Sequence, residues 1–285
     1  HGRRSRRYQL KRSTVSLVLT VLCAAAVTAM GGRERAPAAP ANPRIRLATT
    51  TSTENSGLLG HILPLFEART GYYVHVVAVG TGAALRLGEN GDADLVLVHA
   101  RAQEDAFVAA GHGVDRRDVM HNDFIIIGPA ADPAGIRGAG SAAEAFSRIA
   151  SAGAVFVSRG DRSGTHVKEQ EIWRAVGVPP SGAWYKESGQ GMEQVILMAN
   201  SLEGYTLTDR GTWLAVQDRT NLKIAYEGDK TLFNPYGIIA VNPTRWPAVN
   251  HQGAKALMDW MTSREGRAAI EGFKLKGEQL FFVSR

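Results

Sequence analysis

Short apolar segments typical of β-strands alternate with segments of helical periodicity along most of this chain. The expected strands are residues 44–50, 72–79, 95–98, 124–127, 155–157 and 236–241, and the expected helices are residues 57–70, 82–88, 166–176 and 251–266. This alternation is typical of a parallel sheet with helices packed on its faces. The chain has 285 residues, 44% of them hydrophobic, which is enough for one large or two modest domains.

Two of the expected strands are candidates for crossing between two lobes. They are the strands near residues 124–127 and 237–241, which stand far apart in the sequence. If the chain crosses there, lobe I comprises residues 44–127 and 236–285, and lobe II comprises residues 128–235. The sequence therefore predicts an α/β fold of two lobes joined by hinge strands.

Residues 1–36 have the layout of an export signal. A basic stretch from Arg3 to Arg12 precedes an apolar run from Val15 to about Met30, and a Pro/Ala-rich segment, residues 37–43, follows. The run of about 16 residues is shorter than the roughly 20 needed to cross a bilayer. We therefore expect a signal peptide, a flexible segment and a periplasmic mature protein; a retained membrane anchor is the alternative.

Two details of this leader bear on the export route. Residues 5–11 (SRRYQLK) resemble a twin-arginine signal, with Gln9 where that signal prefers an aromatic residue. Cys23 is the single cysteine of the chain, and the residue before it is Leu22, whereas a lipidated cysteine follows a small residue. We therefore favour cleavage over lipidation. Cleavage would leave a mature chain without disulfides, thiolate metal sites or cysteine nucleophiles.

The net charge of +6 lies almost entirely in the leader. Residues 1–36 contain eight Lys/Arg and one Glu, so the rest of the chain keeps 25 of the 33 basic and 26 of the 27 acidic residues. A near-neutral chain of this kind does not carry the basic surface of a nucleic-acid-binding protein. We expect no nucleic-acid partner.

The first expected strand ends in a run of hydroxyl residues. Residues 49–53 (TTTST) stand between that strand and the next helix. One Ser or Thr suffices to cap a helix, whereas five offer further donors beside the free N–H groups of the helix start. Such a turn is a ready site for an anion. Thr50, Thr51 and Ser52 are our candidate ligands there.

The second expected strand ends in residues 79–82 (VGTG), where Thr81 offers a hydroxyl and Gly82 allows close backbone approach. This turn alone is a weak signal. It gains weight because neighbouring parallel strands end at the same sheet edge, where α/β proteins bind ligands. Thr81 and Gly82 are therefore added to the candidate site.

A third polar turn follows the strand near residue 156. Residues 158–166 (SRGDRSGTH) lead into the next helix. Arg159 can donate two parallel hydrogen bonds to an oxyanion, and Ser163 and Thr165 can donate hydroxyls. Asp161 is placed to orient Arg159, or to pair with it on the surface. His166 is assigned a structural role.

The donor-rich turns also restrict the ligand. Tungstate, molybdate and sulfate are dianions near neutral pH whose oxygens all accept hydrogen bonds, whereas phosphate usually keeps a proton and gains from a carboxylate. Asp161 is the carboxylate expected to reach an anion here. An unpaired acceptor facing the anion would cost enough to discriminate between these ions. The residues do not separate tungstate from molybdate.

The chain resembles the TupA family, the tungstate-binding components of ABC importers. The similar segments are 49–59 (TTTSTENSGLL), 79–85 (VGTGAAL), 92–100 (DADLVLVHA), 122–129 (NDFIIIGP), 156–169 (FVSRGDRSGTHVKE), 189–192 (GQGM), 205–211 (YTLTDRG) and 234–237 (NPYG). The resemblance implies a type II periplasmic-binding-protein fold with tungstate in a cleft between its lobes. It also implies a membrane permease and its ATPase as partners, with the binding protein itself a monomer.

Carried over by motif, the resemblance assigns the anion contacts to the following residues: Thr50, Thr51, Ser52, Thr81, Gly82, Arg159, Ser163 and Thr165. It implies no cofactor, no cationic metal site and no catalytic residue. The alternatives are a binding protein for phosphate, sulfate or an organic acid, a sensor that presents its liganded form to a receptor, and a hydrolase using Ser163 and His166. The hydrolase is disfavoured because residues 160–164 read GDRSG rather than G-x-S-x-G.

Overall fold

Three parallel strands form one half of the main sheet in the computed structural model, which describes residues 39–284. Strand β1 (Arg44–Thr50) pairs with β2 (Tyr73–Val79) on one side and with β3 (Leu95–Val98) on the other. Leu47 and all four residues of β3 are fully buried. The three strands therefore end at one sheet edge. The expected leader, residues 1–36, lies outside the described residues.

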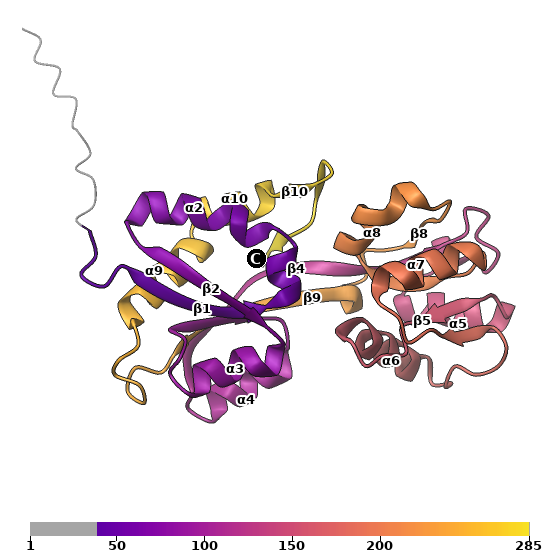
Figure 1. Ribbon diagram of the computed structural model, residues 1–285. Helices are drawn as coiled ribbons and strands as arrows, with labels where there is room; N and C mark the ends of the chain where they lie inside the picture. Colours follow the sequence, from indigo (N-terminus) through magenta and orange to yellow (C-terminus); the bar gives the residue numbers. More distant parts are fainter. Residues whose placement is uncertain (1–38, 285) are drawn as a thin grey trace, which may run out of the picture. The chain divides into compact units, whose positions relative to one another are not determined.

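Three helices follow the first two strands, where the sequence predicted two. Helix α1 (Thr51–Asn55) begins directly after β1, α2 (Leu58–Thr70) follows, and α3 (Thr81–Glu89) begins directly after β2. Pro64 lies inside α2. Helix α4 (Arg101–Ala109) then leads from β3 to the next strand (Figure 1). A helix thus begins within three residues of the end of each of these strands.

The other half of the sheet is antiparallel, so the expected parallel sheet is present only in β1, β2 and β3. The strand order is β12-β4-β9-β3-β1-β2, and β9 (Phe233–Val241) runs antiparallel to β3 on one side and to β4 (Gly113–Gly128) on the other. The reason is that β9 returns from the other lobe and enters between β3 and β4 from the opposite direction. The α/β class with two sets of packed helices is confirmed.

Strand β4 is longer than the sequence indicated. Its first part pairs with β9, and its last part pairs with β7 (Thr206–Asp209) and β8 (Lys223–Tyr226). Only residues 124–127 were expected as strand, because residues 115–123 carry five charged side chains and lack a hydrophobic run. The same strand thus serves both halves of the molecule (Figure 1). We propose that the lobes divide within β4 and β9.

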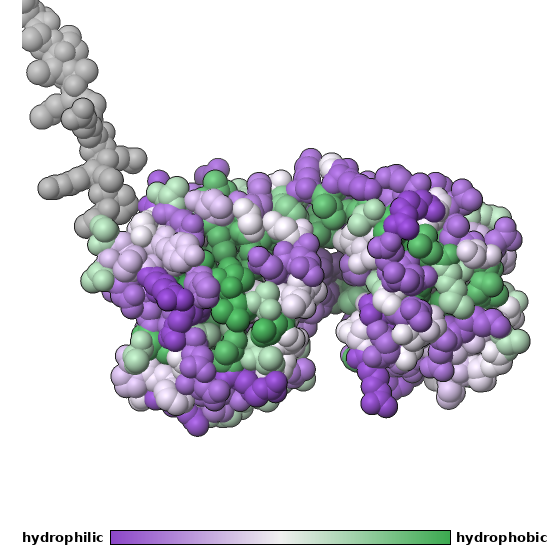
Figure 2. All heavy atoms as spheres, in the orientation of Figure 1, coloured by the Kyte–Doolittle hydropathy of each residue, from purple (hydrophilic) through white to green (hydrophobic). Residues whose placement is uncertain are grey.

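Separate hydrophobic cores lie on either side of these strands. Lobe I is centred on Leu47 and Leu95 with helices α2, α9 (His251–Thr262) and α10 (Arg264–Gly272). Lobe II contains α5 (Ala142–Ala152), β5 (Phe156–Ser158), α6 (Gly164–Val176), β6 (Tyr185–Glu187), α7 (Met192–Ser201) and α8 (Arg210–Val216). Figure 2 shows a notch in the surface between the two lobes on this face.

The remaining elements are short. They are the 3₁₀ turns η1 (Ile136–Gly138), η2 (Gln217–Arg219) and η3 (Lys230–Leu232), and the strands β10 (Lys274–Leu275), β11 (Glu278–Gln279) and β12 (Phe282–Val283). Trp173 and Trp213 are buried in the cores of lobe II. Within residues 39–284, no helix is long and apolar enough to cross a membrane.

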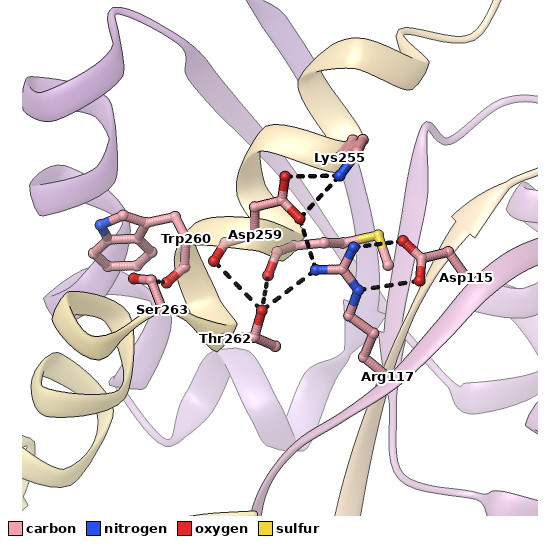
Figure 3. A network of polar contacts seen from close by, with 8 residues as sticks. Asp115, Arg117, Lys255, Asp259, Trp260, Thr262 and Ser263 are labelled. Carbon is pink, nitrogen blue, oxygen red and sulfur yellow. Dashed lines mark hydrogen bonds and ion pairs between the residues drawn. The ribbon is translucent and has the colours of Figure 1, made fainter.

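The expected helix over residues 251–266 is two helices. Ser263 ends α9 and caps α10, where its Oγ accepts a hydrogen bond of 3.2 Å from the N–H of Gly266. The apolar spacing continues across this break, which is why the sequence pattern did not reveal it. Figure 3 shows how the end of α9 is tied to β4: Arg117 donates to Asp259 (2.8 Å) and Thr262 (3.3 Å).

Candidate anion-binding site

Thr50 ends β1 and caps α1, so it fixes the first polar turn. Its Oγ1 accepts a hydrogen bond of 3.3 Å from the N–H of Thr53 and lies 2.6 Å from the hydroxyl of Thr53. Thr49 and Thr53 are fully buried, and Thr49 donates its hydroxyl to the carbonyl of Leu97 (2.7 Å). Two of the five hydroxyl residues are therefore structural.

The exposed hydroxyls of this turn come from the next two residues. Thr51 and Ser52 are exposed in the first turn of α1, and the hydroxyl of Ser52 lies 3.1 Å from that of Thr50. The structure thus places Thr50 and Ser52 together, with Thr51 beside them on the helix. Their hydroxyls and the free N–H groups of the helix start form a set of donors at one edge of the sheet.

Thr81 and Gly82 lie at the same edge of lobe I. Thr50 is paired in register with Val79, the last residue of β2, and α3 begins two residues later at Thr81. Gly80 caps α3 without a side-chain hydrogen bond, so the first N–H groups of α3 receive no acceptor from their cap residue. The parallel pairing therefore places two helix starts on neighbouring strand ends, as the sequence predicted.

Arg159 lies on the loop between β5 and α6 in lobe II. Its Nη2 donates a hydrogen bond of 2.6 Å to Oδ2 of Asp161, whereas its buried Nε has no hydrogen-bond partner among the described residues. Oδ1 of Asp161 accepts from the N–H of Ser163 (3.1 Å). Both oxygens of Asp161 are therefore engaged, and the guanidinium keeps a free donor.

Hydrogen bonds keep the carboxyl of Asp161 charged. Partial burial opposes ionisation, but the hydrogen bonds from Ser163 and Arg159 outweigh it and lower the pKa of Asp161 below its usual value. Asp161 is thus an orienting partner of Arg159, one of the two roles that the sequence left open. An acceptor already bonded in this way does not need to face the anion.

Ser163 caps α6, and its Oγ accepts a hydrogen bond of 3.3 Å from the N–H of His166. Thr165, in the first turn of α6, is buried. Nδ1 of His166 accepts from the N–H of Arg162 (2.9 Å), and Nε2 faces the amide of Gln170 (3.2 Å). With both ring nitrogens engaged elsewhere, His166 is not paired with Ser163 as a general base, which argues against the hydrolase alternative.

A buried carboxylate supports this loop from behind. Glu169 accepts hydrogen bonds from the hydroxyls of Ser158 (2.6 Å) and Tyr185 (2.6 Å) and from the indole of Trp173 (3.1 Å). Ser158 in turn accepts from the N–H of Gly160. Burial raises the pKa of Glu169 above its usual value, and its hydrogen bonds oppose that rise. The network fixes the start of the loop that carries Arg159.

Sequence reasoning missed His99, which connects the hydroxyl turn of lobe I (residues 49–53) to the crossing strand β9. His99 follows β3, and its Nε2 lies 3.3 Å from the hydroxyls of both Thr50 and Ser52. Its Nδ1 lies 3.2 Å from Oδ1 of Asn234 on β9. The eight histidines of the chain show no ligand spacing, so only its position directly after a strand that ends at the candidate edge could have indicated His99.

A second missed feature is an ion pair at the crossing strands. Arg210, the first residue of α8, donates to both oxygens of Asp123 on β4 at 2.8 and 2.7 Å, and also pairs with Glu227. Asp123 is 6% exposed. The hydrogen bonds to Asp123 raise the pKa of Arg210, so the guanidinium stays charged. These residues lie far apart in the sequence, which gave no sign of their pairing.

Comparison with known proteins places the chain in context. Residues 37–265 match the family model of a PBP superfamily domain. The tungstate-binding protein TupA of Peptoclostridium acidaminophilum is 47% identical over 228 residues, which cover 79% of this chain and 80% of that protein.

Solved structures agree with this match. The tungstate-binding protein TupA from Desulfovibrio alaskensis G20 is 48% identical with a TM-score of 0.83, over 85% of this chain and 99% of that one. A structure described as the tungstate ABC transporter from Geobacter sulfurreducens is 54% identical with a TM-score of 0.68, over 81% and 98% of the two chains. Both extend over nearly the whole of the described part.

Proposed function

This chain belongs to the TupA family of the PBP superfamily, and on that premise we propose that it captures tungstate and delivers it to the permease of an ABC importer. One observation in the site carries the proposal: Arg159 keeps a buried, unpartnered Nε donor among the described residues, while its Nη2 donates to Asp161. A guanidinium oriented in this way suits an oxyanion that accepts at every oxygen.

The proposed ligands hydrogen-bond to the oxygens of the anion, and none coordinates the tungsten atom. Thr50, Thr51 and Ser52 with Thr81 and Gly82 supply the lobe I donors, and Arg159, Ser163 and Thr165 supply those of lobe II. Since the donors belong to two lobes joined by β4 and β9, an anion that bridges them favours a closed form over an open one. Binding therefore changes the conformation that the protein presents to the permease.

The partners follow from the same role. We propose that a membrane permease recognises the closed form and that a separate ATPase subunit drives import, with the binding protein acting outside the cytoplasm as a monomer. Export by the twin-arginine route is a further proposal that rests on residues 5–11. Purified permease and ATPase in lipid vesicles would test delivery: the tungstate-loaded protein should stimulate ATP hydrolysis more than the tungstate-free protein.

Equilibrium dialysis tests the capture step. The mature protein would be dialysed against equal concentrations of tungstate, molybdate and ³⁵S-labelled sulfate. Bound tungsten and molybdenum would be counted per chain by elemental analysis, and bound sulfate by the radioactivity of its sulfur. The proposal expects about one oxyanion per chain with tungsten predominant. Predominance of sulfur, or of phosphorus when phosphate is added, would keep a binding role and reject the ligand.

A further inference from the structure

The ring of His99 is held between the candidate anion turn and the crossing strands. Nδ1 faces Oδ1 of Asn234 at 3.2 Å, and the Nδ2 of Asn234 donates to Oδ1 of Asn122 at 2.8 Å. Because the amide of Asn234 uses its donor on Asn122, its oxygen remains as the acceptor for His99. The proton of the neutral imidazole is therefore on Nδ1.

This tautomer makes Nε2 an acceptor, although it faces two hydroxyls that the anion needs as donors. Nε2 lies 3.3 Å from Oγ1 of Thr50 and 3.3 Å from Oγ of Ser52. When one of these hydroxyls donates to Nε2, its hydrogen no longer points toward the sheet edge. In the neutral state of His99, the lobe I turn is thus one donor short for an oxyanion.

We propose, resting on the function proposed above, that His99 is a further residue of the anion site, which takes up one proton from solvent when the oxyanion binds. With Nε2 protonated, the ring donates to the hydroxyl oxygens instead of accepting from them. The hydroxyl hydrogen that pointed at Nε2 is then released to the anion, and the positive charge of the ring lies behind the two hydroxyls. The hydrogen bond from Nδ1 to Asn234 is kept throughout.

The surroundings of the His99 ring are consistent with its protonation when the anion binds. Burial lowers the pKa of His99, with Asn234 opposing, so the ring is neutral at pH 7 before the anion arrives. The neighbouring elements carry charged or titratable groups that include Glu54 on α1, Arg101 and Glu104 on α4, Asp123 on β4 and Tyr236 on β9. Glu104 is buried, accepts from the N–H of Ala100 and pairs with Arg116. Arg101 pairs with Asp105 and Asp123 pairs with Arg210, while Tyr236 packs on the ring with centroids 4.8 Å apart.

Thermodynamic linkage between proton binding and anion binding determines whether the affinity for the anion rises or falls with pH. An anion that favours the protonated ring raises the pKa of His99, and by reciprocity protonation raises the affinity for the anion. Affinity is therefore highest below the pKa of the free protein and falls by up to about tenfold per pH unit as pH rises to the pKa of the bound form. Above that pKa the affinity is constant.

Two measurements on the wild-type protein test the proposal without any variant. Long-range ¹H–¹⁵N spectra of the anion-free protein at pH 7.5 should show His99 as the Nδ1–H tautomer. Calorimetric titration with tungstate at one pH, in buffers of different ionisation enthalpy, should show uptake of a fraction of a proton up to one per anion bound. An Nε2–H tautomer, or binding without proton uptake, would overturn the proposal.

Variants locate the proton. His99→Gln places a permanent amide donor near the position of Nε2, so it should bind tungstate with no proton uptake and with an affinity that does not change between pH 6 and 8. His61→Gln, at an exposed position on α2, should behave as wild type. Uptake lost in His166→Gln but kept in His99→Gln would assign the proton to the other lobe and reject our proposal.

The same titrations distinguish failure of the proposed tungstate-binding function from failure of the proposed role of His99. Wild-type protein that gives no heat with tungstate would reject the proposed function, and the role of His99 with it. Wild-type protein that binds tungstate tightly without proton uptake would leave the proposed function standing and reject the role of His99 alone.

Discussion

Arg159 and Asp161 are joined by a hydrogen bond of 2.6 Å between Nη2 and Oδ2, while the buried Nε of the same arginine has no partner among the described residues. The carboxylate thus holds one side of the guanidinium and leaves the other to a ligand. An arginine held in this way loses little conformational freedom when it binds an anion.

Replacing Arg159 by alanine should weaken tungstate binding by about tenfold to a hundredfold, because a hydrogen bond to a charged group contributes about 1.5–3 kcal/mol. The variant should unfold at the wild-type temperature, since the side chain pairs only within its own loop. Arg219→Ala is a suitable control, because Arg219 pairs with Glu193 at an exposed position. Calorimetry measures both, and wild-type affinity in Arg159→Ala would remove Arg159 from the site.

The ion pair at the crossing strands should matter for stability. Asp123→Leu leaves the guanidinium of Arg210, 12% exposed, without its bidentate partner, and we expect a loss of about 3 kcal/mol in the free energy of unfolding. Arg210→Met should be costly for the same reason. The double variant should lose less than the sum of the two, as urea unfolding would show. Strict additivity would mean that the pair is not coupled.

Two glycines should respond in opposite directions to alanine. A Cβ on Gly128, at the end of β4, would overlap the ring of Tyr205, so Gly128→Ala should destabilise the protein by about 1–3 kcal/mol. A Cβ on Gly60, inside α2, meets nothing within 4 Å, and Gly60→Ala should stabilise by about 0.5–1 kcal/mol through helix propensity. Equal effects in thermal unfolding would contradict the packing described for Gly128.

Glu169 should make stability depend on pH. Burial raises its pKa in the folded protein above the value of 4.5 that applies to the unfolded chain. Between these two values the folded state binds more protons, so the unfolding free energy falls as pH rises through the window and is constant above it. Comparison of wild type with Glu169→Gln by urea unfolding from pH 4 upward isolates this contribution. A wild-type profile that rises relative to the variant in that window would contradict the burial argument.

Much of the fold was predictable because local patterns dictate it. The expected bounds of β1 and β3 agree with the structure, since β1 alternates polar and apolar residues and β3 is a short apolar run between polar turns. The hydroxyl turn at Thr50 was also placed correctly at a helix start. In these places propensity, periodicity and capping all favour the same structure.

The features that sequence reasoning missed depend on residues distant in the chain. The first part of β4 has no apolar run and is a strand because β9 returns beside it. His99 reaches Thr50 because β3 lies next to β1, and it reaches Asn234 because β9 lies next to β3. Register between strands 50 to 140 residues apart cannot be deduced from one sequence, so these contacts required the structure.

The most direct test of the account is calorimetric titration of the mature protein, residues 37–285, with tungstate, molybdate, sulfate and phosphate in turn. We expect tight tungstate binding with one site per chain and no heat from sulfate or phosphate; the titration also measures the margin over molybdate. Heat from phosphate or sulfate with none from tungstate would contradict the central claim, while leaving a two-lobed binding protein for a different anion.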